Sequence, residues 1–138
     1  DASLPGDGEK PYDLTRARVL LAEDNEINAE IVTVILEGYG AQVERAHDGR
    51  EAVAMFQAAP GAYTLILMDI QMPLMDGLEA SRAIRNHQKD DGKAVPIIGL
   101  SANAFREDVD KAIQSGMNGY LSKPIDKTKL LETVRRFL

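Results

Sequence analysis

The chain alternates between short apolar runs and longer segments in which apolar residues recur every three or four positions. The apolar runs cover residues 19–22, 63–68, 95–100 and 119–121, and residues 42–46 can form a further strand of mixed polarity. Runs this short, bounded by polar residues, are typical of buried strands in a parallel sheet. The segments between them have helical spacing, as in Ile27, Ile31 and Val34, and several end at glycines.

This alternation of five predicted strands with five predicted helices indicates an α/β fold. The expected architecture is a doubly wound, five-stranded parallel sheet with helices on both faces. Crossover connections between parallel strands are almost always right-handed, which leaves few topologies. In open sheets of this kind the functional crevice lies beyond the carboxyl ends of the strands. The residues that follow each strand are therefore the first candidates for chemistry.

Length and composition narrow the class of protein. With 138 residues the chain is sized for one domain, and we expect a linker or disordered arm over 1–17 and the domain over 18–138. The absence of Cys excludes thiol catalysis and Cys-ligated metal sites. The net charge of −6 argues against direct nucleic-acid binding. No apolar run approaches the roughly 20 residues of a membrane span, so we expect a cytoplasmic domain, even if its parent protein is membrane-anchored.

Polar residues stand at four of the five predicted strand ends. Glu23 and Asp24 follow the first strand, Asp69 the third, Ser101 the fourth and Lys123 the fifth. Three neighbouring carboxylates repel one another unless they take up protons or bind a cation. Oxygen ligands without His or Cys favour Mg²⁺, with Mn²⁺ as a substitute. Asp69 is then placed to act as a nucleophile toward phosphorus, with Lys123 and Ser101 facing the phosphoryl oxygens.

Each of these residues alone has a simpler explanation. A single Asp after a strand is more often a helix cap than a metal ligand, so Asp24 alone would be assigned as a cap. Ser101 alone would be an ordinary loop hydroxyl, and Lys123 a solvated surface charge. Their joint occurrence at the carboxyl ends of the strands is what favours a functional site.

Four segments resemble the receiver domains of two-component response regulators. They are LLAEDNEIN, LILMDIQMPLMDGLEA, IIGLSAN and GYLSKPI, and the resemblance extends from about Arg18 to Leu138. MDIQMPLMDG and EDNEIN are most similar to the receivers of hybrid sensor histidine kinases. The resemblance implies the flavodoxin-like (CheY-like) receiver fold, with strand order 2-1-3-4-5.

The resemblance also implies a role for each site residue. Asp69 would be the phosphoacceptor, with Ser101 and Lys123 contacting the phosphoryl group. Ser101 and Tyr120 would form the switch that responds to phosphorylation. The Mg²⁺ ligands would be Glu23, Asp24, Asp69 and the backbone carbonyl of Gln71, and the Lys123–Pro124 peptide bond would be cis.

The expected partner is a histidine kinase or a histidine phosphotransfer domain that donates or receives the phosphoryl group. We expect it to dock over the crevice against residues 28–35, because the donor histidine must approach Asp69. The domain would at most catalyse its own phosphotransfer and dephosphorylation, while its parent chain would be a histidine kinase. Many receivers dimerise through the switch face, so a weak homodimer is also expected.

Three alternatives remain open from the sequence. A Mg²⁺-dependent phosphohydrolase of the haloacid-dehalogenase type needs a second acid two residues after its nucleophile, where this chain has Gln71. A flavodoxin-like flavin binder needs a first loop rich in Gly, Ser or Thr, where this chain has Glu23 and Asp24. A degenerate receiver would act only as a binding module, although the key positions are intact.

Overall fold

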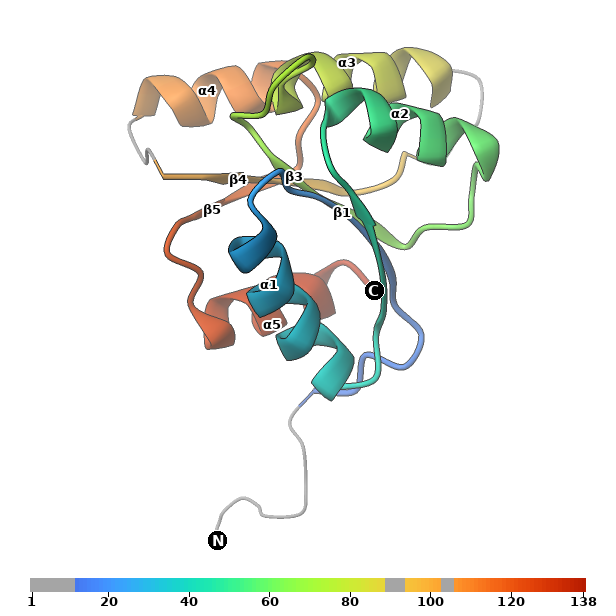
Figure 1. The fold of residues 1–138 in the computed structure, drawn as a ribbon, viewed down its shortest axis with the longest axis vertical. Helices are drawn as coiled ribbons and strands as arrows, with labels where there is room; N and C mark the ends of the chain where they lie inside the picture. The colour runs from blue at the N-terminus through green and yellow to red at the C-terminus, as the bar shows by residue number, and fades with distance from the viewer. Residues whose placement is uncertain (1–11, 89–93, 103–105) are drawn as a thin grey trace, which may run out of the picture.

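The computed structural model describes residues 12–88, 94–102 and 106–138. Strands and helices alternate along the chain and form a sheet covered on both faces (Figure 1). The strands are β1 (Arg18–Ala22), β2 (Gln42–Ala46), β3 (Leu65–Asp69), β4 (Ile97–Ser101) and β5 (Gly119–Ser122). The helices are α1 (Glu26–Gly38), α2 (Gly49–Ala58), α3 (Gly77–Gln88), α4 (Arg106–Gln114) and α5 (Lys127–Arg136). All strand pairs are parallel in the order β2-β1-β3-β4-β5, which confirms the predicted fold class.

Two hydrophobic cores lie on opposite faces of the sheet. Helices α2, α3 and α4 cover one face, and α1 and α5 cover the other (Figure 1). Neighbouring residues of β3 point into different cores: Ile66 packs on the α2–α4 side and Leu67 on the α1–α5 side. Because both faces are buried, the central strands are apolar at nearly every position, and this explains the uninterrupted runs in the sequence.

The third and fourth strands run one residue further than their apolar patterns predict. β3 includes Asp69 and β4 includes Ser101, because the backbone of both residues still pairs with the neighbouring strand. The same strands begin later than predicted, and β4 starts only after Pro96, which has no N–H to give to a ladder. Two of the candidate functional side chains are therefore fixed by the sheet rather than by a loop.

The arm predicted over residues 1–17 is only partly within the described residues, since 1–11 lie outside them. Within 12–17, Leu14 and Ala17 are buried in the core on the α1–α5 side. The Leu14 amide donates a hydrogen bond to the Tyr39 carbonyl at 3.0 Å. The packed domain thus begins before Arg18, because these two apolar residues are part of that core. None of the helices in the described part of the chain is long and apolar enough to cross a membrane.

Candidate functional site

Three acidic side chains meet at the carboxyl end of the sheet. Glu23 and Asp24 follow β1, and Asp69 ends the neighbouring strand β3. One carboxylate oxygen from each residue lies within 4.8 Å of the others. Glu23 and Asp69 are only 1% and 3% exposed, whereas Asp24 is exposed at the mouth of the site. The structure therefore brings together the acids that the strand-end pattern singled out.

The helix-cap explanation for Asp24 does not apply, because Asn25 caps α1. The Asn25 side chain accepts a hydrogen bond from the Asn28 amide at 2.9 Å. The Asn25 amide in turn donates to Glu23 Oε2 at 3.2 Å. The cap of the first helix thus holds one acid of the site and leaves the Asp24 carboxylate available to a cation.

Arg45 supports the acidic loop, a role that no pattern in the sequence predicts. Its Nε donates to the Glu23 carbonyl at 3.1 Å, and its Nη2 reaches the Asp24 carbonyl at 3.3 Å. Arg45 lies opposite Leu21 in the β1–β2 register, close to the end of β1. The guanidinium binds the backbone of the loop and so leaves both carboxylates facing the site.

Lys123 supplies the positive charge of the site. Its Nζ lies 2.9 Å from Glu23 Oε1 and 3.1 Å from Asp69 Oδ2, and its side chain is 17% exposed. The Lys123 amide donates to the Ser101 carbonyl at 2.8 Å, and the Lys123–Pro124 peptide bond is cis. A solvated surface lysine would not be buried against two carboxylates, so the simpler explanation for this residue fails.

The electrostatics of Asp69 show that the site holds an excess of negative charge. Burial, followed by the nearby Glu23 carboxylate, raises the pKa of Asp69 to about 7, although Lys123 opposes the shift. Burial would lower the pKa of Lys123, but its contacts with Glu23 and Asp69 outweigh burial and raise it. One ammonium thus does not neutralise three carboxylates, and a divalent cation bound by oxygen ligands would.

The other predicted residues lie on or directly after the strands β3, β4 and β5. Gln71 lies two residues beyond Asp69, and its amide donates to Asp69 Oδ1 at 3.1 Å. Ser101 is buried at the end of β4, the strand next to β3. Tyr120 is half-buried in β5 on the α2–α4 side, and its buried hydroxyl has no hydrogen-bond partner among the described residues. Of these three residues, Gln71 contacts Asp69 directly, and Ser101 ends the strand that pairs with β3.

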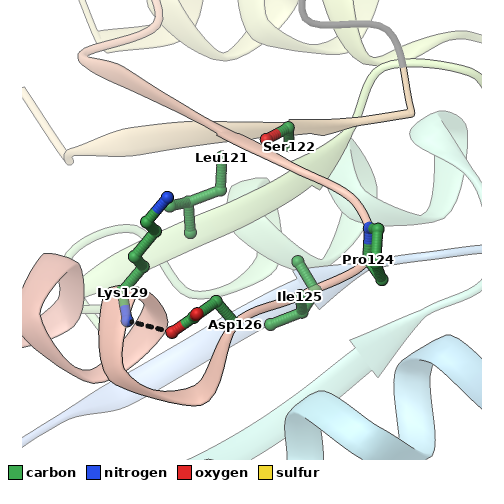
Figure 2. A pocket seen from close by; sticks show the side chains of 6 residues that line it. All are labelled: Leu121, Ser122, Pro124, Ile125, Asp126 and Lys129. Carbon is green, nitrogen blue, oxygen red and sulfur yellow. Dashed lines mark hydrogen bonds between the residues drawn. The ribbon is translucent and has the colours of Figure 1, made fainter.

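An open hollow of about 520 Å³ lies beside the acids and is lined by Asp24, Ile70, Gln71, Met72, Pro73 and Asp76. A second, much smaller hollow of about 50 Å³ lies between β5 and the start of α5. Figure 2 shows this second hollow, where the Asp126 side chain accepts from the Lys129 amide at 3.0 Å and caps α5. None of the three acids lines this second hollow, whereas Asp24 lines the first, next to residues that directly follow Asp69 in the chain.

Known proteins are similar to this chain over most of its length. A hybrid signal transduction histidine kinase of Dictyostelium discoideum is 38% identical over 120 residues, which cover 85% of this chain and 7% of the relative. A histidine kinase of Arabidopsis thaliana is 34% identical and is matched over 93% of this chain and 13% of its own length. The chain therefore spans only a small part of the length of these curated relatives.

Solved structures share the fold. One is the receiver domain of the Saccharomyces cerevisiae response regulator Ssk1, in complex with the histidine phosphotransfer protein Ypd1. It is 32% identical to this chain with a TM-score of 0.84, and the match covers 93% of this chain and 91% of the Ssk1 chain. The receiver domain of sensor histidine kinase PA1611 from Pseudomonas aeruginosa, with magnesium coordinated in its active-site cleft, is 38% identical with a TM-score of 0.77 and covers 88% and 96%.

The response regulator receiver domain family matches residues 19–135. This match covers both the sheet and the acidic site at its carboxyl end, and it decides against a haloacid-dehalogenase phosphohydrolase and against a flavin binder. The chain belongs to the response regulator receiver family, as a receiver domain of two-component phosphorelays.

Proposed function

We propose that this domain accepts a phosphoryl group from a phosphohistidine onto Asp69. The observation that carries the proposal is the position of Asp69, buried beside Glu23 with Lys123 Nζ 3.1 Å from its Oδ2. In the transfer, an Asp69 carboxylate oxygen forms a bond to phosphorus while the phosphorus–nitrogen bond to the donor imidazole breaks. Such a reaction asks the protein mainly for positioning and for neutralisation of charge.

The surrounding residues fit a magnesium-dependent reaction. Glu23, Asp24, Asp69 and the Gln71 carbonyl would hold Mg²⁺, or Mn²⁺ in its place, since all four offer oxygen ligands. The cation would neutralise charge on the transferring group. Lys123 would pair with one phosphoryl oxygen and Ser101 would donate a hydrogen bond to another. Movement of Ser101 toward the phosphoryl group, with an inward turn of Tyr120, would then change the surface around α4, β5 and α5.

A direct test is exposure of the purified domain to acetyl phosphate and Mg²⁺, followed by mass spectrometry of the intact protein. We expect the mass to increase by one phosphoryl group, and we expect EDTA to prevent the increase because the acids then repel the incoming anion. A generic phosphomonoester should not be turned over. A domain that gains no mass under these conditions would be a degenerate receiver that acts only by binding.

The phosphoryl donor or acceptor is proposed to be a histidine kinase or a histidine phosphotransfer domain, and the parent protein a hybrid sensor histidine kinase. The support comes from the kinase relatives and from the Ypd1 complex of a similar receiver. A cytoplasmic location, weak self-association and the lack of direct nucleic-acid binding stay predictions.

The surface of α1 fits this partner. Ile27, Ile31 and Val34 are 69%, 45% and 62% exposed and follow one another at helical spacing. Their helix begins directly after the acidic loop, so a partner that covers this stripe brings its histidine toward Asp69. Ile31 and Val34 lie within the docking region 28–35 that the sequence predicts. The opposite face of the same helix is buried in the core through Ala29, Val32 and Leu36.

Replacement of Ile31 by Glu should slow phosphoryl transfer from histidine-phosphorylated Ypd1 by roughly tenfold, since a charge would enter the apolar interface. Phosphorylation by acetyl phosphate, which needs no docked protein, should be unchanged. Ile113→Glu is the matched control, because Ile113 is 50% exposed on α4. Equal transfer rates for wild type and Ile31→Glu would contradict docking on α1.

A further inference from the structure

The last strand carries Tyr120 and leads to Lys123, yet little within β5 fixes its register. β5 has four residues, lies at the edge of the sheet and is half-buried or exposed along its length. Tyr120 packs on the α2–α4 side and Leu121 on the α1–α5 side. A slip of one residue would exchange these two faces and shift Lys123 by about 3.3 Å. The packing of these two partly buried side chains favours one register, and contacts outside the strand add to it.

Asn118, just before β5, makes two hydrogen bonds to a single residue of β4. Its amide donates to the Ile97 carbonyl at 2.7 Å. Its side-chain Oδ1 accepts from the Ile97 amide at 2.9 Å. Together these bonds place Asn118 opposite Ile97, directly before the first paired residues Ile98 and Gly119. The side chain satisfies a backbone donor of β4 that the short strand itself does not reach.

Arg85, from helix α3, fixes the Asn118 side chain. Its Nη2 donates to Asn118 Oδ1 at 2.7 Å, and its Nε donates to the Gly116 carbonyl at 2.9 Å. The oxygen of the Asn118 amide thus accepts from two donors, and a flipped amide would place its NH₂ group against both. The arginine joins α3 to the turn that connects α4 with β5.

Gly116 lets Arg85 approach this closely. Its φ is +103°, and a Cβ atom at this position would lie 2.6 Å from Arg85 Cγ. A side chain here would be strained by the backbone and would displace the arginine. The contact between Arg85 and this turn therefore depends on glycine at position 116.

We propose that Arg85 and Asn118 are positioning residues that help to set the register of β5 and thereby hold Lys123 at the phosphoacceptor. They act from the opposite end of the strand and touch no reacting atom. At the other end of the β4–β5 pairing, the Lys123 amide donates a hydrogen bond to the Ser101 carbonyl at 2.8 Å. This inference rests on the proposed phosphorylation of Asp69, and it names residues to which that function assigns no role.

The test compares Asn118→Ala with Asn118→Asp, which keeps an acceptor oxygen for both donors. Asn118→Ala should lower the rate of phosphorylation by acetyl phosphate about tenfold, because Lys123 is displaced. Mg²⁺ binding should be retained, since the three acidic side chains lie at the ends of β1 and β3 and not on β5. Asn118→Asp should restore the rate, and Arg85→Met should lower it as Asn118→Ala does. Asn86→Ala, an exposed neighbour on α3, is the control and should leave the rate unchanged.

The double variant Asn118→Ala/Lys123→Ala separates positioning from a general loss of stability. If Asn118 acts through Lys123, its replacement should cause no further loss of rate in the Lys123→Ala background. An additive loss, or an unchanged rate in Asn118→Ala alone, would overturn the inference.

Nuclear Overhauser effects between β4 and β5 test the register without phosphorylation. In the wild type they should report the pairs Ile98–Gly119 and Leu100–Leu121, and they should weaken or shift in Asn118→Ala. If the wild type takes up no phosphoryl group, the proposed function fails, and these spectra still decide the inference. An unchanged pattern in Asn118→Ala would refute the register role by itself.

Discussion

Asp69→Asn should abolish phosphoryl uptake and at the same time make the metal-free domain more stable above pH 7. Uptake is lost because an amide cannot form the acyl phosphate, and we expect a fall of at least roughly a thousandfold. Stability rises because the variant removes one of two buried carboxylates that repel each other, Asp69 and Glu23. A gain in stability on loss of the nucleophile is typical of sites whose charges are arranged for function.

The pH dependence of this gain follows from the pKa of Asp69. Burial and Glu23 raise the pKa of Asp69 from 3.8 to about 7, so between these values the folded protein binds more protons than the unfolded chain. The free energy of unfolding of the wild type therefore falls as pH rises through this window, and the full penalty is present above pH 7. Asp69→Asn lacks this penalty, and its free energy of unfolding should be higher by about 2 kcal/mol. This gain is smaller than the free energy that corresponds to the whole pKa shift, because the amide pairs less well with Lys123.

Urea unfolding of the metal-free proteins at pH 5 and pH 8 measures the effect. The advantage of Asp69→Asn should be larger at pH 8 than at pH 5. Asp110→Asn, an exposed acid on α4, is the matched control and should show no such difference. An Asp69→Asn variant that still gains a phosphoryl group would overturn the assignment of the phosphoacceptor.

Lys123→Ala should slow phosphorylation by about a hundredfold and destabilise the domain. The rate falls because the ammonium lies where charge develops on the transferring phosphoryl group. Stability falls by about 2 kcal/mol, since Glu23 and Asp69 would stay buried without their cation. Because Lys123 lowers the pKa of Asp69, its removal should raise that pKa further.

Three measurements check this second prediction: the rate with acetyl phosphate, urea unfolding, and the pH at which Asp69 titrates by NMR. Lys129→Ala is the matched control, because Lys129 is an exposed lysine on α5 whose backbone amide, not its side chain, bonds Asp126. Lys123→Ala and Lys129→Ala should differ in all three measurements. If they behave alike, Lys123 contributes neither to phosphorylation nor to the stability of the site.

Sequence patterns predict the order of strands and helices and the residues that stand at the strand ends. A sheet covered on both faces requires apolar residues at consecutive strand positions, so each run and its polar end can be recognised without a structure. For the same reason Glu23, Asp69 and Lys123 were predicted to converge, since parallel strands end at one edge. The predicted ends of β3 and β4 are one residue too early, because backbone pairing and not side-chain polarity decides that Asp69 and Ser101 still belong to the strands.

The burial of these groups and the contacts that hold them in place depend on how the elements pack together. This packing buries Glu23 and leaves Asp24 exposed, although the two are adjacent in the chain, and it raises the pKa of Asp69 through a carboxylate on another strand. The contacts of Arg45 and of Arg85 with Asn118 likewise join elements far apart in the sequence. Hydrophobic periodicity indicates which face of an element is buried, but it does not give the distances between side chains of different elements. Those distances determine the pKa of Asp69, the register of β5 and the reactivity of the site.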